Sequence, residues 1–210
     1  MYDAILFDLD GTLIDTESVA LRSKQKVFAD LGHDVEESFL HRLVGVDRPS
    51  AQAIILERFP GLDVALLDKR SHEAFSNEIS QQLPLKPGVH EIMAATRGYK
   101  RAVVTSSERA SALRKLTMTG LLAEFDAVIS LDDVSAAKPS PEPYLTAAAK
   151  LGVAPTACLV FEDSETGAQA GYRAGCTVAQ VPDMIPAHGQ WNHYSAPTLI
   201  EAAKLAGLTI

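Results

Sequence analysis

The sequence has few cysteines and no excess of positive charge. Its 210 residues include 2 cysteines, and 27 acidic against 19 basic side chains give a net charge of −8. Two cysteines do not make the disulfide framework of a small secreted protein, so Cys158 and Cys176 are expected to be buried, reduced thiols. An acidic chain without a Lys/Arg cluster is a poor ligand for nucleic acid or for an anionic membrane. The composition therefore predicts no nucleic-acid and no membrane partner.

Long apolar runs are also missing. No stretch approaches the length of about 18 apolar residues that indicates a membrane-spanning helix. Asp3, Asp8 and Asp10 interrupt the only apolar run near the N-terminus, so no secretory signal is expected and the predicted location is cytoplasmic. The 47% hydrophobic and 22% charged residues are typical of a soluble globular protein and exclude general disorder. Nothing in the sequence demands more than a monomer.

The segment from Ala4 to Phe7 is an apolar run followed directly by Asp8-Leu9-Asp10-Gly11. Such a run, closed by Asp-Gly, predicts a buried strand that ends in a turn. In open α/β sheets, ligands bind at the carboxyl ends of the strands. Two acids this close repel each other unless a cation or a proton intervenes. Taken alone, the segment fits a solvated turn as well as it fits a functional site.

The rest of the chain separates into a helical part and an alternating part. Between Leu13 and Leu83 the patterns are helical, and no strand pattern stands out. After Leu83, helical patterns alternate with short apolar strands at 101–105, 127–130, 157–161 and 177–181. Alternation of this kind predicts βαβ units and a parallel sheet. The predicted fold class is α/β: residues 1–14 and 84–210 form a Rossmann-like core of about five parallel strands, and residues 15–83 form an inserted all-helical cap.

The first four predicted core strands lead into polar groups. They are Asp8 and Asp10, then Thr105 and Ser106, then Lys138 beyond the third strand, and finally Glu162 and Asp163. Carboxylate oxygens are the ligands that suit Mg²⁺. A carboxylate can attack phosphorus, a second acid can move the proton, and a hydroxyl and an ammonium can stabilise the charge of the transferring group. This set of residues predicts phosphoryl transfer.

The same residues resemble a known family. Asp8-Leu9-Asp10-Gly11-Thr12, Thr105, Lys138-Pro139 and Glu162-Asp163 are similar to the four motifs of the haloacid dehalogenase (HAD) superfamily, in its Mg²⁺-dependent phosphatase branch, and stand in the same order. The resemblance covers essentially the whole chain. It is greatest to the β-phosphoglucomutase and sugar-phosphate phosphatase group, whose members carry a helical cap between the first and second motifs.

The resemblance implies roles for the acidic residues. Asp8 would be the nucleophile and a metal ligand, and Asp10 would be the general acid/base, with its backbone carbonyl also on Mg²⁺. Glu162 and Asp163 match the metal-binding motif, with Asp163 expected as the direct ligand. The alternative for the last two is that they cap the following helix, since Asp is a favoured N-cap residue.

The resemblance also implies a phosphate site. Thr105 and Lys138 would bind the phosphoryl group, and Lys138 would balance the charge of Asp8. The backbone N–H groups of Leu9 and Ser106 would be further donors. Considered singly, Thr105 would more often be a strand-end cap and Lys138 a solvated lysine; together with the ordered acids they favour a site.

In the predicted cap, Gly45-Val46-Asp47-Arg48 resembles a family segment in which an arginine reaches the substrate phosphate. Arg48 is therefore expected at the non-reacting end of the substrate, with an exposed surface arginine as the alternative. The mutases carry a histidine four residues after a threonine that matches Thr16, and Ala20 stands there in this chain. This difference disfavours phosphomutase activity.

The sequence thus predicts a phosphoric monoester hydrolase: a Mg²⁺-dependent phosphatase acting on a small phosphorylated metabolite, such as a sugar phosphate, through an aspartyl-phosphate. A β-phosphoglucomutase-like phosphomutase is the alternative, disfavoured by Ala20. A 2-haloacid dehalogenase would need neither Asp10 nor a metal. A catalytically silent binding protein on the same scaffold would be expected to lack one of Asp8, Asp10 and Lys138, and all three are present.

Overall fold

The computed structural model describes residues 2–44 and 46–210. The chain divides into two compact units, which we call the core unit (Met1–Asp15 and Pro84–Ile210) and the helical unit (Thr16–Leu83). Gly45, the first residue of the predicted Gly45–Arg48 segment, lies outside the described residues. The role of the helical unit as a cap stays a prediction.

The core unit contains a parallel sheet of six strands in the order β3-β2-β1-β4-β5-β6. The strands are β1 (Ala4–Phe7), β2 (Lys100–Val104), β3 (Ala127–Ile129), β4 (Cys158–Glu162), β5 (Thr177–Gln180) and β6 (Tyr194–Ser195). All four residues of β1 are buried because the strand lies between β2 and β4 and both faces of the sheet are covered. The predicted Rossmann-like α/β fold is confirmed.

Strand β6 was not predicted. It has two residues, too few to show any periodicity, and it pairs with β5 in a parallel register. Two backbone hydrogen bonds extend this pairing, from His193 N to Val178 O (2.8 Å) and from Ala196 N to Gln180 O (3.1 Å). The short strand therefore fastens the chain that follows β5 to the edge of the sheet.

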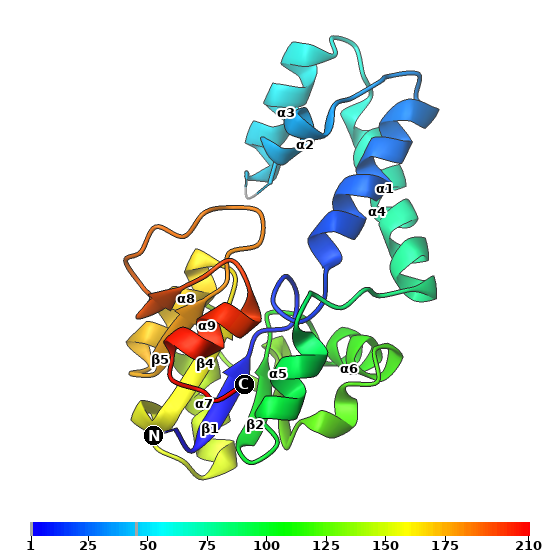
Figure 1. Cartoon of the computed structure of the whole chain (residues 1–210). Coiled ribbons are helices and arrows are strands. Elements are labelled where there is room, and N and C mark those ends of the chain that lie inside the picture. Colours follow the sequence, from blue (N-terminus) through cyan, green and yellow to red (C-terminus); the bar gives the residue numbers. More distant parts are fainter. Residues whose placement is uncertain (1, 45) are drawn as a thin grey trace. The chain divides into compact units, whose positions relative to one another are not determined.

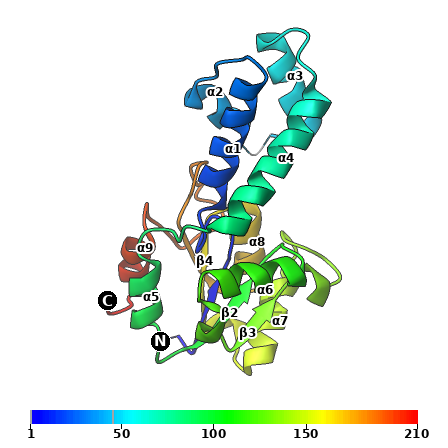
Figure 2. The same cartoon turned by 90° about the vertical axis from the view of Figure 1, so that its right-hand side faces the viewer.

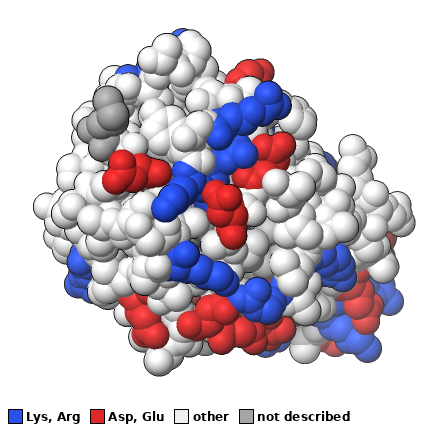
Figure 3. Space-filling view, turned by 90° about the horizontal axis from the view of Figure 1, so that it is seen from below, with Lys and Arg blue, Asp and Glu red and all other residues white. Residues whose placement is uncertain are grey.

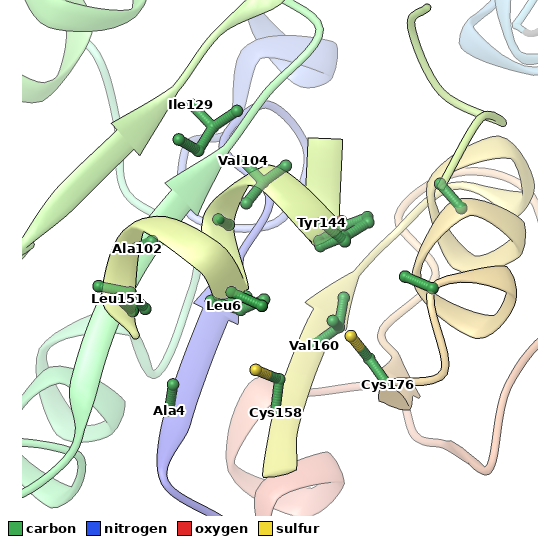
Figure 4. Packing of buried hydrophobic residues seen from close by; sticks show 14 of the residues in the cluster. Ala4, Leu6, Ala102, Val104, Ile129, Tyr144, Leu151, Cys158, Val160 and Cys176 are labelled. Atoms are coloured by element: carbon green, nitrogen blue, oxygen red, sulfur yellow. The ribbon is translucent and has the colours of Figure 1, made fainter. Parts of the chain in front are cut away.

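Helices cover both faces of the sheet (Figures 1 and 2). The helices of the core unit are α5 (Val89–Ala95), α6 (Arg109–Met118), α7 (Glu142–Leu151), α8 (Glu165–Arg173) and α9 (Leu199–Leu205), with short 3-10 turns η1 (Leu122–Glu124), η2 (Leu131–Asp133) and η3 (Pro155–Ala157). On one face, α7 and α8 pack on a buried cluster that includes Leu6, Val104, Tyr144 and Val160 (Figure 4). On the other face, α5 packs against α9.

The helical unit has a hydrophobic core of its own. Its helices are α1 (Thr16–Asp30), α2 (Glu37–His41), α3 (Arg48–Arg58) and α4 (Val64–Gln81). Phe28, Ile55 and Leu67 lie at the centre of this core. Asp47 and Asp63 start α3 and α4 by accepting hydrogen bonds from backbone N–H groups three residues ahead. Capping and apolar periodicity explain why these segments are helical.

Basic and acidic side chains are interspersed on the face of the molecule shown in Figure 3. That face therefore carries no broad area of positive charge. Within residues 2–44 and 46–210, no helix combines the length and apolar character needed to cross a membrane.

Candidate active site

Three neighbouring strands bring most of the predicted site residues of the core unit to the carboxyl end of the sheet, where Lys138 joins them from the segment after β3. Phe7 of β1 is in register with Val103 of β2 and with Phe161 of β4. Asp8 therefore follows β1 at the same level at which β2 and β4 reach their last residues, Val104 and Glu162. Sequence segments that are far apart thus deliver their polar ends to one place, as the parallel topology requires.

Asp8, Glu162 and Asp163 form a compact group of carboxylates. Each offers an oxygen within 4.8 Å of the others'. The ammonium of Lys138 donates to Asp8 Oδ1 (2.6 Å), to Glu162 Oε1 (2.5 Å) and to the carbonyl of Val104 (2.8 Å). Asp8 and Glu162 are buried. One buried lysine faces three acids, so the group is short of positive charge when all are ionised.

The pKa values of these groups reflect that shortage. Burial raises the pKa of Asp8 well above its usual range; Lys138 opposes the rise, and Glu162 and Asp163 add to it. Burial and the charge of Glu162 raise the pKa of Asp163 to about 7. Burial disfavours the charge of Lys138, but Asp8 and Glu162 raise its pKa above the ordinary value. A cation added to the group would favour the ionised acids.

The acids differ in how many hydrogen bonds they already accept. Asp163 accepts one from Thr12 Oγ1 at Oδ1 (3.1 Å). No described residue donates to Oδ2 of Asp163 or to Oδ2 of Asp8. Glu162 instead has both oxygens engaged, by Lys138 and the Tyr144 hydroxyl (2.6 Å) at Oε1 and by Ser164 Oγ (3.1 Å) at Oε2. Asp8 and Asp163 therefore have oxygens available to a metal ion, whereas Glu162 would have to give up a hydrogen bond.

Two glycines make room for these carboxylates. Gly11 has φ +86°, and a Cβ there would lie 2.4 Å from Asp163 Oδ2. A Cβ at Gly167, in the first turn of α8, would lie 1.9 Å from Glu162 Oε1. Any other residue at either position would push an acid aside.

The predicted phosphate donors lie on the loops that follow β1 and β2. The backbone N–H groups of Leu9 and Ser106 donate to no acceptor among the described residues, although Leu9 is fully buried. An unpaired buried N–H group such as that of Leu9 is rare, and a phosphate oxygen would satisfy it; Ser106 is exposed, so its N–H can bond to water. Thr105 Oγ1 accepts from Ser107 N (3.1 Å), so this hydroxyl does cap the turn, while its own proton has no acceptor in the described chain.

Asp10 stands apart from the other acids. Its carboxylate accepts from Lys115 Nζ at both oxygens (2.6 and 2.8 Å) and from Ser107 Oγ at Oδ2 (2.9 Å). Sequence reasoning missed this role of Lys115 and Ser107. The available signal was that Lys115 falls on the same helical stripe as the apolar Ala112 and Leu116. It also missed Thr12 and Tyr144, which hold Asp163 and Glu162.

Arg48 is the predicted site residue that belongs to the helical unit. It is the first residue of α3, its Nε donates to Asp68 Oδ2 (2.9 Å), and its side chain is 72% exposed. Its contact with a substrate stays a prediction.

Residues 5–181 match the family described as haloacid dehalogenase-like hydrolase. The chain belongs to this family. A phosphorylated carbohydrates phosphatase of Thermotoga maritima is 33% identical over 176 residues, which are 82% of each chain. The fructose-1-phosphate phosphatase YqaB of Escherichia coli is 34% identical over 86% of this chain and 96% of its own.

A solved HAD family hydrolase from Deinococcus radiodurans, with bound phosphate and sodium, has a TM-score of 0.82 and 28% identity over 99% of this chain and 98% of that one. The sequence motifs therefore identified the family correctly. The phosphatases among the relatives confirm the predicted enzyme class, phosphoric monoester hydrolase.

Proposed function

We propose that this HAD-like hydrolase is a Mg²⁺-dependent phosphatase that hydrolyses a small phosphorylated metabolite, such as a sugar phosphate, through an aspartyl-phosphate on Asp8. The observation that carries the proposal is the compact group of Asp8, Glu162 and Asp163 with Lys138 bound to the first two, beside two backbone N–H groups that find no acceptor among the described residues. The two curated relatives are named for phosphorylated carbohydrates and for fructose 1-phosphate, which supports this class of substrate.

The donor set fits Mg²⁺. Asp8 and Asp163 would hold the ion through the carboxylate oxygens to which no described residue donates, together with the backbone carbonyl of Asp10. Bound there, Mg²⁺ would neutralise charge on the acids and on the phosphoryl oxygens. We propose that Glu162 supports Lys138 rather than ligating the metal directly, since both of its oxygens are engaged.

In the first step, a carboxylate oxygen of Asp8 attacks the phosphorus, and the bond from phosphorus to the leaving oxygen breaks. Asp10 donates its proton to that oxygen. The attacking oxygen is Oδ1, to which Lys138 donates, so Lys138 sets the direction of attack, while Oδ2 would face the metal. Thr105 and the N–H groups of Leu9 and Ser106 would stabilise the negative charge on the phosphoryl oxygens.

In the second step, water attacks the phosphorus of the aspartyl-phosphate. Asp10, now ionised, takes the proton of the water, and the bond between phosphorus and Asp8 breaks. Inorganic phosphate leaves, and both carboxyl groups return to their starting states.

A panel of sugar phosphates and aryl phosphates, assayed with Mg²⁺ and with a chelator, tests the proposal. We expect turnover of at least one sugar phosphate that disappears with the chelator and returns on adding Mg²⁺. Absence of Mg²⁺-dependent turnover across the panel would contradict the proposal. Conversion to an isomeric sugar phosphate, without release of inorganic phosphate, would favour the mutase.

Arg48 is proposed to contact the part of the substrate that does not react. It lines a pocket of about 600 Å³ within the helical unit, together with Ala20, Lys24 and Lys69. Asp68, which also lines the pocket, already accepts hydrogen bonds from Arg48 and Gln52. The pocket therefore carries more basic than acidic side chains and suits an anionic or hydroxyl-rich group.

Arg48→Ala is expected to raise KM for the best sugar phosphate of the panel by about tenfold, because a charge-assisted hydrogen bond is lost. KM for p-nitrophenyl phosphate should change little, since that ester lacks a remote polar group. Arg58→Ala, at the other end of α3, is the matched control. Equal effects of Arg48→Ala on both substrates would remove Arg48 from substrate recognition.

A further inference from the structure

Lys115 is a buried lysine that does not belong to the carboxylate group around Lys138. It lies in α6, and its side chain is only 9% exposed. Its ammonium donates to Asp10 Oδ1 (2.6 Å), to Asp10 Oδ2 (2.8 Å) and to Ser107 Oγ (3.2 Å). No other acid among the described residues pairs with it.

A lysine at this position is costly. Ala112 and Leu116, its neighbours on the buried stripe of α6, show that an apolar residue would suit the place. An ammonium removed from water is strongly destabilising unless a well-placed partner compensates for it. Asp10 lies 105 positions earlier in the chain and provides that compensation. The pair therefore links α6 to the loop that follows β1.

Lys115 and Ser107 contact the Asp10 carboxylate, which is still partly exposed to solvent. The side chain of Asp10 is 29% exposed, whereas that of Lys115 is 9% exposed. Ser107 donates to Asp10 Oδ2 (2.9 Å) and also accepts from Lys115, so three groups close a small triangle of hydrogen bonds. Contacts to both oxygens fix the plane of the carboxylate, which a single hydrogen bond would leave free to rotate.

We propose that Lys115, supported by Ser107, is the positioning residue for Asp10: it sets the orientation from which this carboxyl group exchanges a proton with the leaving oxygen. The inference rests on the proposed function, in which Asp10 is the general acid. Lys115 touches no reacting atom and acts through Asp10. The arrangement predicts that orientation, rather than substrate binding, is lost when Lys115 is removed.

The dependence of kcat/KM on the basicity of the leaving group distinguishes this role from a purely structural one. A benzyl oxide ion is a strongly basic leaving group and needs a proton as the ester bond breaks, whereas p-nitrophenolate leaves readily without one. The ratio of kcat/KM for p-nitrophenyl phosphate to kcat/KM for benzyl phosphate therefore measures proton donation. A general loss of folded protein lowers both values by the same factor and leaves the ratio unchanged.

The experiment compares the wild type with Lys115→Met, with Asp10→Asn and with the double variant, all in saturating Mg²⁺. Arg114→Met, at the neighbouring exposed position of α6, is the matched control. We expect Lys115→Met to raise the ratio about tenfold or more, and Asp10→Asn to raise it at least as much. The double variant should match Asp10→Asn, because Lys115 has no orientation left to set.

An unchanged ratio in Lys115→Met, or an additive effect in the double variant, would overturn the inference. Ser107→Ala is the second variant if Lys115→Met does not fold; it should raise the ratio less, and no change there would overturn the inference as well. Failure of the proposed function has a different signature: either the wild type hydrolyses neither ester, or Asp10→Asn leaves the ratio as in the wild type.

Discussion

Ionisation of the Asp163 carboxyl group destabilises the metal-free folded state. Burial and the Glu162 carboxylate raise its pKa from 3.8 to about 7, although Thr12 donates a hydrogen bond to it. An unfolded chain ionises this group near the lower value. The metal-free folded state therefore loses stability from Asp163 as the pH rises from the lower pKa through the upper one.

Asp163→Asn removes this titration and keeps the shape of the side chain. In a chelator, the free energy of unfolding of the wild type should fall relative to that of Asp163→Asn as the pH rises from about 4 to about 8. Urea unfolding at several pH values measures the difference between the two proteins. A difference that stays constant over this range would contradict the assignment of the raised pKa to Asp163.

The grouping of the site residues could be predicted from the sequence where a motif carries them. Asp8 and Asp163 follow strands β1 and β4, Lys138 lies beyond β3, and the structure brings the three together. Tyr144 and Lys115 could not be predicted in this way. Their partners, Glu162 and Asp10, lie 18 and 105 positions away, and no local pattern encodes such a pairing.

Helix α8 is built closely around Glu162. Its N-cap, Ser164, accepts from Gly167 N (3.1 Å) and donates to Glu162 Oε2. Gly167 supplies the space in which the Glu162 carboxylate lies. The first turn of the helix and the last residue of β4 therefore depend on each other.

Gly167→Ala should displace Glu162 and loosen its hold on Lys138. We expect a loss of about 2 kcal/mol or more in the free energy of unfolding, because overpacking is added to a disturbed buried ion pair. Turnover of p-nitrophenyl phosphate should also fall. Thermal or urea unfolding measures the first effect, and steady-state kinetics the second.

Gly98→Ala is the matched control for this variant, since an added Cβ at Gly98 meets nothing within 4 Å. It should change stability by less than about 0.5 kcal/mol. If Gly167→Ala were as stable and as active as Gly98→Ala, the close packing of α8 on Glu162 would be irrelevant to the site.

Most elements could be predicted from periodicity, because helices of 7–18 residues and fully buried strands leave a clear pattern. Two features escaped it. Strand β6 is too short to leave a pattern. The start of helix α6 at Arg109 was not specified either, because it depends on the turn in which Ser107 donates its N–H to Thr105 Oγ1.

At the scale of the whole molecule, the two compact units have separate hydrophobic cores. Phe28 is fully buried in the core of the helical unit, and Phe161 is fully buried in the sheet of the core unit. Truncation of either side chain to alanine is expected to cost about 3–5 kcal/mol in its own unit. Because the cores are separate, we expect each truncation to destabilise mainly the unit that contains the truncated residue.

Phe28→Ala should therefore speed amide hydrogen exchange mainly within Thr16–Leu83, whereas Phe161→Ala should speed it mainly in the core strands. Hydrogen exchange resolved by mass spectrometry over both units measures the pattern. Faster exchange spread equally over both units in each variant would show that the chain opens as one cooperative body instead.

Asp8 is the proposed nucleophile of a Mg²⁺-dependent phosphatase. Asp8→Asn keeps the size of the side chain but removes the attacking carboxylate, so it leaves nothing to form the aspartyl-phosphate. The most direct test is kcat/KM for p-nitrophenyl phosphate in saturating Mg²⁺, measured for the wild type and for Asp8→Asn. We predict Mg²⁺-dependent turnover by the wild type and a loss of about a thousandfold or more in the folded variant; a variant that retains the rate of the wild type would contradict the account.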